Sequence, residues 1–180
     1  MGNILIYKDE ITKAMTLLGT DERVIFIGQN VVYPGAIAVS ETFNGIPLSR
    51  RIELPVIEDM QMGMSIGLSL MGFIPLSLYP RMDFLIIATN ELVNHLDKIE
   101  EMSCGGFKPI VIIRTCVGLR EPLDPGPQHC QDHTEMLRSC LTNIDILKLE
   151  RAEDIVPAYK RALESGKSTI LIELAIKMRS

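Results

Sequence analysis

The sequence predicts an α/β domain with a doubly wound, mainly parallel six-stranded sheet and helices on both faces. Short, nearly continuous apolar runs, such as residues 24–27 and 110–113, recur along the chain. Runs of this kind are typical of strands that are covered on both faces. Segments with helical periodicity alternate with them, which favours parallel pairing. No linker or internal repeat divides the 180 residues, so we expect a single domain over residues 1–180.

Six strands follow from the apolar runs. Arg50 and Arg51 mark the entrance of the second one. The predicted strands cover residues 23–28, 51–54, 74–79, 109–114, 144–148 and 169–174.

Helical periodicity fills the intervals between the strands. Residues 7–18 carry an apolar stripe that includes Ile11, Ala14 and Leu18, all on one face of a helix. Gly166 stands just after the last predicted helix, where a left-handed cap is common. The other predicted helices cover residues 59–71, 82–102, 130–141 and 152–164.

The predicted helix over residues 59–71 is apolar on nearly all sides and contains Gly63 and Gly67. Each glycine inside a helix costs about 1 kcal/mol relative to alanine. We therefore expect close packing to require these small residues, which predicts a central position for this helix.

Charge and composition argue against several classes of protein. A net charge of −5 and a pI near 5.2 disfavour a nucleic-acid binder, which normally has a basic face. Lys8, Asp9 and Glu10 interrupt the apolar start, so a signal peptide is not predicted. The apolar-rich residues 60–79 contain several glycines and Pro75, which favours a buried helix and strand over a membrane span. The four cysteines stand singly, as in a reducing compartment, and we expect a cytoplasmic protein.

Two nucleotide-binding motifs are absent from the sequence. It has no Gly-x-Gly-x-x-Gly and no P-loop. His129 and His133 are four residues apart, but no further ligand follows at a metal-binding spacing. We predict no metal site within this chain.

In a doubly wound sheet, ligands bind beyond the carboxyl ends of the strands. This rule directs the search for functional residues to segments 28–36, 55–60, 80–84 and 115–131. The last segment contains a long irregular stretch, rich in proline and glycine, and long loops in compact domains are usually functional or mobile.

Three segments, in order, resemble one protein family. The first is Pro55-Val56-Ile57-Glu58 followed by Gly63, Gly67 and Gly72; the second is Asp83-Phe84-Leu85 followed by Asn94-His95; the third is residues 109–115 followed by Val117-Gly118 and Gln128-His129-Cys130-Gln131. Together they are similar to the pyrimidine-binding domain of the beta subunits of 2-oxo-acid dehydrogenase first components, in the transketolase family. The likeness runs from about Arg23 to Glu173.

The resemblance implies that Glu58 binds and activates thiamine diphosphate. In this family a carboxylate hydrogen-bonded to the aminopyrimidine promotes the tautomer that takes the thiazolium proton. Such a carboxyl group must share a proton near neutral pH, which calls for apolar surroundings. These are expected from Pro55, Val56, Ile57, Met60 and Met62. Without the resemblance, the local pattern is more typical of an acid at a helix N-terminus, which is how we interpret Asp59.

Phe84 and His129 are the other implied site residues. Phe84 matches the family's aromatic ring stacked on the aminopyrimidine, although core packing is the more common role of an isolated Phe. His129 matches a loop histidine that exchanges protons with a 2-oxo acid at the reacting end of the cofactor; the alternative is a histidine that caps the following helix. Gln128 and Gln131 would support it. His95 is expected to satisfy a buried hydrogen bond in the long helix.

The implied cofactors are thiamine diphosphate and magnesium. The family holds the metal and the diphosphate with a Gly-Asp-Gly motif and a downstream Asn on another domain, and this sequence has neither. The resemblance therefore implies a diphosphate-binding, alpha-type partner subunit that holds most of the magnesium site. An α2β2 heterotetramer is the simplest such assembly.

The sequence departs from the family pattern in three places. Gln29-Asn30 replaces an acidic pair that takes part in proton communication between active sites, and an amide cannot titrate. The loop over residues 119–127 differs in length. The second domain of the beta subunits has no counterpart before the end at Ser180.

The resulting functional expectation is a pyrimidine-binding subunit of a two-component thiamine-diphosphate enzyme. Such an enzyme decarboxylates a 2-oxo acid or cleaves a ketol, and transfers the acyl or hydroxyalkyl unit to an acceptor. A non-catalytic assembly or regulatory subunit with the same fold is the alternative. A flavodoxin-like binding domain would explain the strand–helix alternation but not the three ordered segments.

Overall fold

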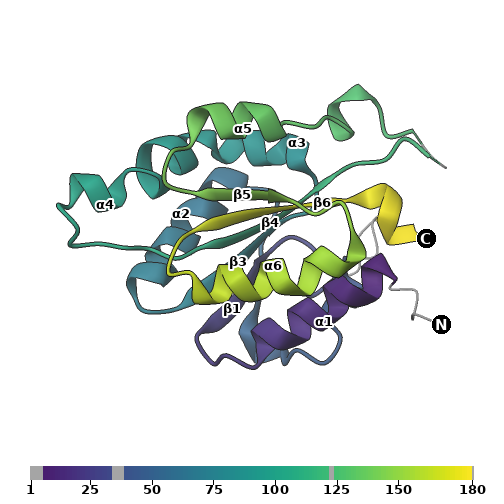
Figure 1. Ribbon diagram of the computed structural model, residues 1–180, viewed down its shortest axis with the longest axis horizontal. Helices are drawn as coiled ribbons and strands as arrows, with labels where there is room; N and C mark the ends of the chain where they lie inside the picture. Colours follow the sequence, from purple (N-terminus) through teal and green to yellow (C-terminus); the bar gives the residue numbers. More distant parts are fainter. Residues whose placement is uncertain (1–5, 34–38, 122–123, 180) are drawn as a thin grey trace.

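Six strands form one sheet in which every neighbouring pair runs parallel, in the order β2-β1-β3-β4-β6-β5. The computed structural model describes residues 6–33, 39–121 and 124–179 (Figure 1). The strands are β1 (Val24–Gly28), β2 (Arg51–Glu53), β3 (Ile74–Tyr79), β4 (Ile112–Val117), β5 (Asp145–Lys148) and β6 (Thr169–Leu174). The predicted doubly wound α/β fold is confirmed, and the sheet is parallel throughout.

Helices cover both faces of the sheet. One face carries α1 (Tyr7–Gly19) and α6 (Ala152–Glu164), and the opposite face carries α3 (Met82–Leu85) and α5 (Thr134–Cys140), as Figure 1 shows. The helix α2 (Glu58–Leu70) joins the α3 and α5 layer, because its buried Met62 and Ile66 belong to that layer's core. A short helix, α4 (Ile99–Met102), precedes β4.

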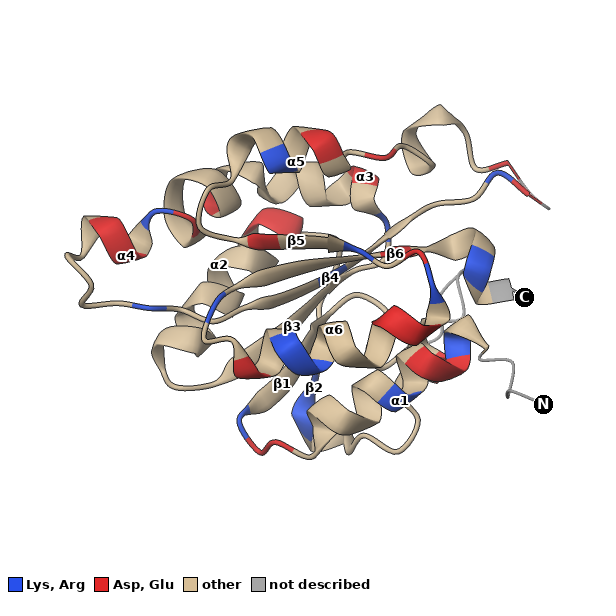
Figure 2. Cartoon of the chain, in the orientation of Figure 1, with Lys and Arg blue, Asp and Glu red and all other residues tan. Residues whose placement is uncertain are grey.

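Each strand supplies side chains to two separate cores, which explains the nearly continuous apolar runs. In β3, Leu76 and Leu78 pack with α1 and α6, whereas Tyr79 packs with α2, α3 and α5. In β4, Ile112 and Ile113 likewise point to opposite faces. Figure 2 shows most charges on helices, loops and the edge strands, and within the central strands β1, β3, β4 and β6 the only charged side chains are Arg114 and Glu173.

The predicted strand over residues 109–114 is displaced by three residues at each end, because serine side chains bind the preceding backbone. The hydroxyl of Ser69 accepts the N–H of Ile110 at 2.6 Å and donates to its carbonyl at 3.0 Å. The hydroxyl of Ser168 accepts the N–H of Val111 at 3.0 Å. These groups are satisfied before the ladder of β4 begins, and they tie α2 and the start of β6 to this strand.

The prediction of one continuous helix over residues 82–102 is wrong. The segment divides into α3, a 3₁₀ turn (Ile86–Ala88), a π-helical turn (Glu91–Leu96) and α4. The buried Asp97 carboxylate accepts the backbone N–H groups of Thr142 and Asn143 at 3.0 and 2.7 Å, and its own N–H reaches Leu92 five residues back. Burial favours its neutral form, but bonds from Lys98, Asn143 and Thr142 hold the pKa of Asp97 below its usual range. These long-range bonds from Asp97 to residues 142 and 143 coincide with the wider π-helical turn that precedes it.

Two smaller predictions about this half of the chain are also corrected. His95 lies exposed on the π-helical turn and not in a buried hydrogen bond. The helix expected from residue 130 begins at Thr134, because the Asp132 carboxylate accepts the Thr134 N–H at 3.0 Å and the Gln131 N–H bonds elsewhere. The cap at Gly166 is confirmed by its φ of 69°.

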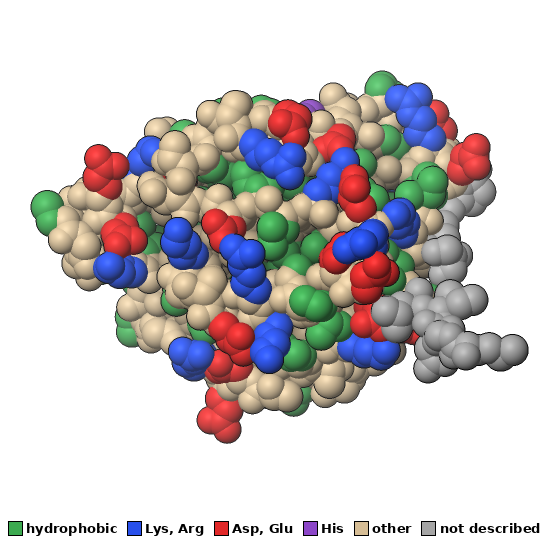
Figure 3. Space-filling model, in the orientation of Figure 1, with side chains coloured by type: hydrophobic (Ala, Val, Ile, Leu, Met, Phe, Trp, Pro, Cys, Tyr) green, Lys and Arg blue, Asp and Glu red, His purple; other side chains and the backbone are tan. Residues whose placement is uncertain are grey.

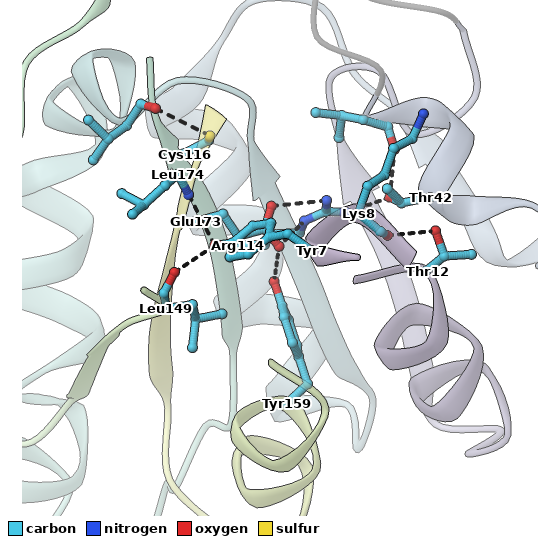
Figure 4. A network of polar contacts seen from close by, with 12 residues as sticks. Tyr7, Lys8, Thr12, Thr42, Arg114, Cys116, Leu149, Tyr159, Glu173 and Leu174 are labelled. Atoms are coloured by element: carbon cyan, nitrogen blue, oxygen red, sulfur yellow. Dashed lines mark hydrogen bonds and ion pairs between the residues drawn. The ribbon is translucent and has the colours of Figure 1, made fainter. Parts of the chain in front are cut away.

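A buried polar network crosses the core between the sheet and the α1 and α6 layer (Figure 4). Arg114 on β4 donates to both carboxylate oxygens of Glu173 on β6, at 2.9 and 3.1 Å, and to the hydroxyl of Thr42 at 2.8 Å. The hydroxyl of Tyr159 from α6 donates to Glu173 at 2.6 Å. The Phe43 ring lies 5.3 Å from the guanidinium carbon of Arg114. The network therefore links two strands, one helix and the segment before β2.

In the described ranges, no helix is long and apolar enough to cross a bilayer. On the face over α1 and α6, Figure 3 shows hydrophobic side chains separated by charged ones of both signs.

Candidate functional site

The strand order reverses direction between β1 and β3, which is where doubly wound sheets bind ligands. The chain first moves outward from β1 to β2 and then returns past β1 to β3. Gly28 ends β1 with φ 139°, and a Cβ on it would lie 2.3 Å from the Leu78 carbonyl oxygen and 2.9 Å from Nε2 of Gln61. Only glycine allows this close approach of β1, β3 and α2. The first turn of α2 therefore lies directly over the switch point.

Glu58 begins α2 at this point and is 3% exposed. Its carboxylate oxygen Oε1 accepts a hydrogen bond from Nε2 of Gln29 at 3.0 Å, and its main-chain carbonyl accepts one from the Tyr79 hydroxyl at 3.3 Å. Burial raises the pKa of Tyr79, so this hydroxyl remains a donor. Asp59, the next residue, is exposed. Of the two acids at this helix start, only Glu58 is buried and held against the end of β1.

The flanking residues do not enclose Glu58 as expected. Val56 is 71% exposed and Met60 is 49% exposed, and Pro55 is also exposed. Met62 is buried, but it belongs to the core between α2 and the sheet. Glu58 is therefore buried by the strand ends and by α2 itself, while Val56 and Met60 form an apolar surface beside it.

The loop that carries Gln29 is organised by Glu53 at the end of β2. The Glu53 carboxylate accepts the backbone N–H groups of Asn30 and Val32, each at 2.7 Å, and that of Tyr33 at 3.4 Å. Asn30 takes a positive φ of 62° in this turn. Residues 34–36 of the expected ligand segment lie outside the described residues.

Phe84 and His129 are brought together at the ends of β3 and β4. Their ring centroids are 5.2 Å apart and the ring planes are nearly perpendicular. Both side chains are partly buried. In the described residues, no hydrogen bond or ring contact joins Glu58 to either of them. The structure thus places Glu58 on one part of the edge and the Phe84–His129 pair on another.

The turn that begins α3 and the loop that carries His129 interlock along their length. Nη1 of Arg81 donates to the His129 carbonyl oxygen at 3.2 Å, and Oδ1 of Asp83 accepts both N and Nε2 of Gln131, each at 3.1 Å. The N–H of His133 points to the Met82 sulfur at 3.4 Å. Sequence reasoning gave Arg81 and Asp83 no role, although Asp83 stood beside Phe84 in one of the three segments.

Buried polar atoms without a hydrogen-bond partner gather at the same edge. Five of the six found in the described ranges belong to α2, the start of α3, β4 and the His129 loop: Gln61 Oε1, Asp83 Oδ2, Thr115 Oγ1, His129 Nδ1 and His133 Nε2. Such atoms are rare in native proteins and call for an explanation, such as a bound group.

A buried carboxylate, a partly exposed aromatic ring and unpaired donors and acceptors fit a flat heterocycle such as an aminopyrimidine. For a metal the fit is different: in the described ranges, no group of three His, Cys, Asp or Glu side chains is arranged to hold an ion. The described part of the edge therefore has features that suit a flat ring, and it has no such cluster of metal ligands.

The fold is a doubly wound α/β domain of the kind that transketolases contain. Among solved structures, a split-gene transketolase described as an inactive beta4 tetramer matches 96% of this chain and 52% of its own, with TM-score 0.73 and 18% identity. A transketolase from Campylobacter jejuni matches 97% of this chain and 26% of its own, with TM-score 0.71 and 13% identity. At these identities the likeness concerns the fold.

Sequence comparison finds similarity to the beta subunits of one enzyme component. The beta subunit of the pyruvate dehydrogenase E1 component is 28% identical over 161 residues in Cyanidium caldarium, covering 87% of this chain and 47% of that protein. In Chaetosphaeridium globosum it is 30% identical over 155 residues, covering 83% and 44%. No protein-family model matches the chain. The chain is thus similar in sequence to E1 beta subunits and in fold to transketolases, and it spans about half the length of the curated relatives it matches.

Proposed function

We propose that the chain is the pyrimidine-binding subunit of a two-component thiamine-diphosphate enzyme. In this proposal the enzyme decarboxylates a 2-oxo acid or cleaves a ketol, and transfers the resulting acyl or hydroxyalkyl unit. The observation that carries the proposal is the burial of Glu58 at the switch point, in a chain whose relatives are E1 beta subunits. Burying a carboxylate costs free energy, so its retention at a ligand-binding edge supports a role in binding.

Each residue has a defined task in this proposal. The bound thiamine diphosphate supplies a carbanion-stabilising thiazolium ring. Glu58 holds a proton at the pyrimidine ring nitrogen, and Gln29 fixes the orientation of its carboxyl group. Phe84 presents an aromatic surface to the pyrimidine, and His129 exchanges protons with the substrate at the reacting end.

A partner subunit is part of the proposal, because the described edge has no arrangement for a metal-bound diphosphate. The outer face of α2 supports it. Among the described residues, a Cβ added to Gly63 or Gly67 would meet nothing within 4 Å, so packing against this part of the chain does not require these glycines. Exposed Met60 and Leu70 stand on the same helix, and exposed Met71 follows its last residue. We infer that the small residues serve a close approach by a diphosphate-binding, alpha-type subunit in an α2β2 assembly, which holds most of the magnesium site.

We retain a cytoplasmic location in the proposal, based on the four free cysteines of the chain.

The test is to co-express the chain with a partner that bears the Gly-Asp-Gly motif, and to measure thiamine-diphosphate binding and 2-oxo-acid turnover. Glu58→Gln should lower kcat by about 10²- to 10⁴-fold, because the amide cannot exchange the proton. Asp59→Asn is the matched control, since it changes the adjacent, exposed acid, and it should leave turnover unchanged. Equal turnover by wild type and Glu58→Gln would refute the role of Glu58. Thiamine-diphosphate binding without turnover of any donor would favour the non-catalytic subunit.

A further inference from the structure

We propose that Asp83 is a positioning residue that holds the His129 loop, here residues 126–133, against α3. Arg81 makes a second contact to the same loop. What the loop does in the reaction rests on the proposed function. The contacts themselves belong to this chain and can be tested without it.

Asp83 makes contacts that explain why a carboxylate is retained at this position. Its side chain is largely buried, and Oδ1 accepts both the backbone N–H and the side-chain amide of Gln131. One acceptor thus fixes both the backbone and the side chain of the residue two positions after His129. Oδ2 is buried and unpaired, and burying an unpaired carboxylate oxygen costs free energy. The fold gains no pairing from that second oxygen, so the contact to the loop is what the carboxylate contributes.

The imidazole of His129 depends on this support, because no hydrogen bond from the described residues fixes the ring. Its buried Nδ1 has no partner in the described part of the chain. Histidines that exchange protons are commonly oriented by a bond at the second ring nitrogen. Here the orientation instead comes from the backbone and from the Phe84 ring.

Backbone contacts hold His129 from two sides. Arg81 donates to its carbonyl oxygen, and a Cβ on Gly118 would lie 1.9 Å from the same oxygen, so the end of β4 passes directly beside it. Gln131 then joins the loop to Asp83 two residues later. If the Asp83 contact is lost, the loop is free to move away from Phe84, and the spacing of the two rings is no longer defined.

The first experiment is proton NMR of the full chain. The chain contains three histidines, so each imidazole signal can be assigned with single His→Gln variants. The difference between wild type and Phe84→Leu gives the part of the His129 imidazole chemical shift that the Phe84 ring causes. Asp83→Leu should lose the same Phe84-dependent shift, whereas Asp83→Asn should keep most of it, because the amide oxygen still accepts from Gln131. Glu135→Gln removes a nearby exposed charge without touching the loop contacts, and it should change nothing.

A milder variant covers the case in which Asp83→Leu does not fold. Gln131→Leu removes only the side-chain donor at an exposed residue, and it should reduce the Phe84-dependent shift of His129 while the signals of the sheet remain. An unchanged His129 shift in either folded variant would overturn the proposal.

The second experiment uses the complex with the partner. A displacement of about 1 Å in a reacting group can cost about 100-fold in rate. Asp83→Leu should therefore lower kcat on this order with little change in KM, and Asp83→Asn should restore most of it. A normal kcat in a variant that has lost the Phe84-dependent shift of His129 would overturn the positioning role. If Asp83→Leu loses the Phe84-dependent shift of His129 but Glu58→Gln turns over substrate as well as wild type, the proposed function fails while the loop contact stands.

Discussion

Two buried polar regions of this chain differ in how completely their groups are paired. In the Arg114–Glu173 network, the guanidinium, the carboxylate and the hydroxyls of Thr42 and Tyr159 all meet partners (Figure 4). At the carboxyl edge, five buried atoms meet none within residues 6–33, 39–121 and 124–179. Buried groups are normally satisfied, and the exceptions concentrate where a ligand or strain is involved. The first region thus serves the fold, and the second has the properties of a binding edge.

Electrostatics supports this distinction. Burial disfavours the charged form of Arg114, but Glu173 beside it holds the pKa of Arg114 above its ordinary value. Burial and Glu173 together raise the pKa of Tyr159, which keeps its hydroxyl a donor. Arg114 and Tyr159 therefore keep their protons over the whole physiological range, which suits a structural tie.

The largest expected effect follows from opening the Arg114 network. Arg114→Met should destabilise the chain by about 3–5 kcal/mol, because it leaves Glu173 buried without its counter-charge. Urea unfolding measures this loss. The double variant Arg114→Met, Glu173→Leu should recover much of it, since both charges are then removed. A double variant as unstable as the single one would show that the pair is worth more than an apolar replacement.

An intermediate effect is expected from Thr42→Val. The Thr42 hydroxyl accepts from Arg114 at 2.8 Å and donates to the Val39 carbonyl at 2.6 Å. Its loss should cost about 1.5–3 kcal/mol, the range for a hydrogen bond to a charged group. Thermal or urea unfolding of the full chain measures it.

Thr115→Val makes the same chemical change in the other region and should have the opposite sign. Thr115 lies in β4 between Tyr79 and Ile172, and its buried hydroxyl is unpaired. Replacing it with an isosteric methyl should stabilise the isolated chain by about 1 kcal/mol. If both threonine variants lose stability equally, the proposed difference between the two regions is wrong.

The smallest effect concerns a partly exposed ion pair between the His129 loop and β5. The Asp132 carboxylate accepts hydrogen bonds from Lys148 and Thr134. Partial burial alone favours the neutral carboxyl group, but these partners lower the pKa of Asp132 from 3.8 to about 2. Since the folded pKa is depressed, the contribution is complete above about pH 4 and is lost as the pH falls towards 2. Asp132 is too exposed for more than about 1 kcal/mol. Asp132→Asn should flatten the stability profile between pH 4 and 2, and an unchanged slope would contradict this assignment.

Local sequence patterns predicted most of the fold. Residues 74–79 and 169–174 are strands with the predicted bounds, and residues 152–164 are a helix as predicted. Their periodicity matches their burial, so local pattern and tertiary position agree. The segment 82–102 was misjudged because Asp97 is anchored to residues 142 and 143, which lie far from it in sequence.

Only part of the candidate site could be predicted from the sequence. Glu58, Phe84 and His129 were selected by their resemblance to a family, and the contact between the rings of Phe84 and His129 remained unknown until the ends of β3 and β4 were placed side by side. The roles proposed for Asp83 and Arg81 have no local signal, because both arise from contacts with residues almost fifty positions away.

The sequence by itself determined which segments are strands and helices, and that the strands are covered on both faces, since these properties depend on spacing along the chain. The tertiary structure alone decided which polar groups are paired. Arg114 and Asp83 are both charged residues beside apolar ones, yet one meets its counter-charge on β6 and the other holds a loop with one oxygen while the second stays unpaired. Pairing is a property of distance between segments remote in sequence, so no local pattern encodes it.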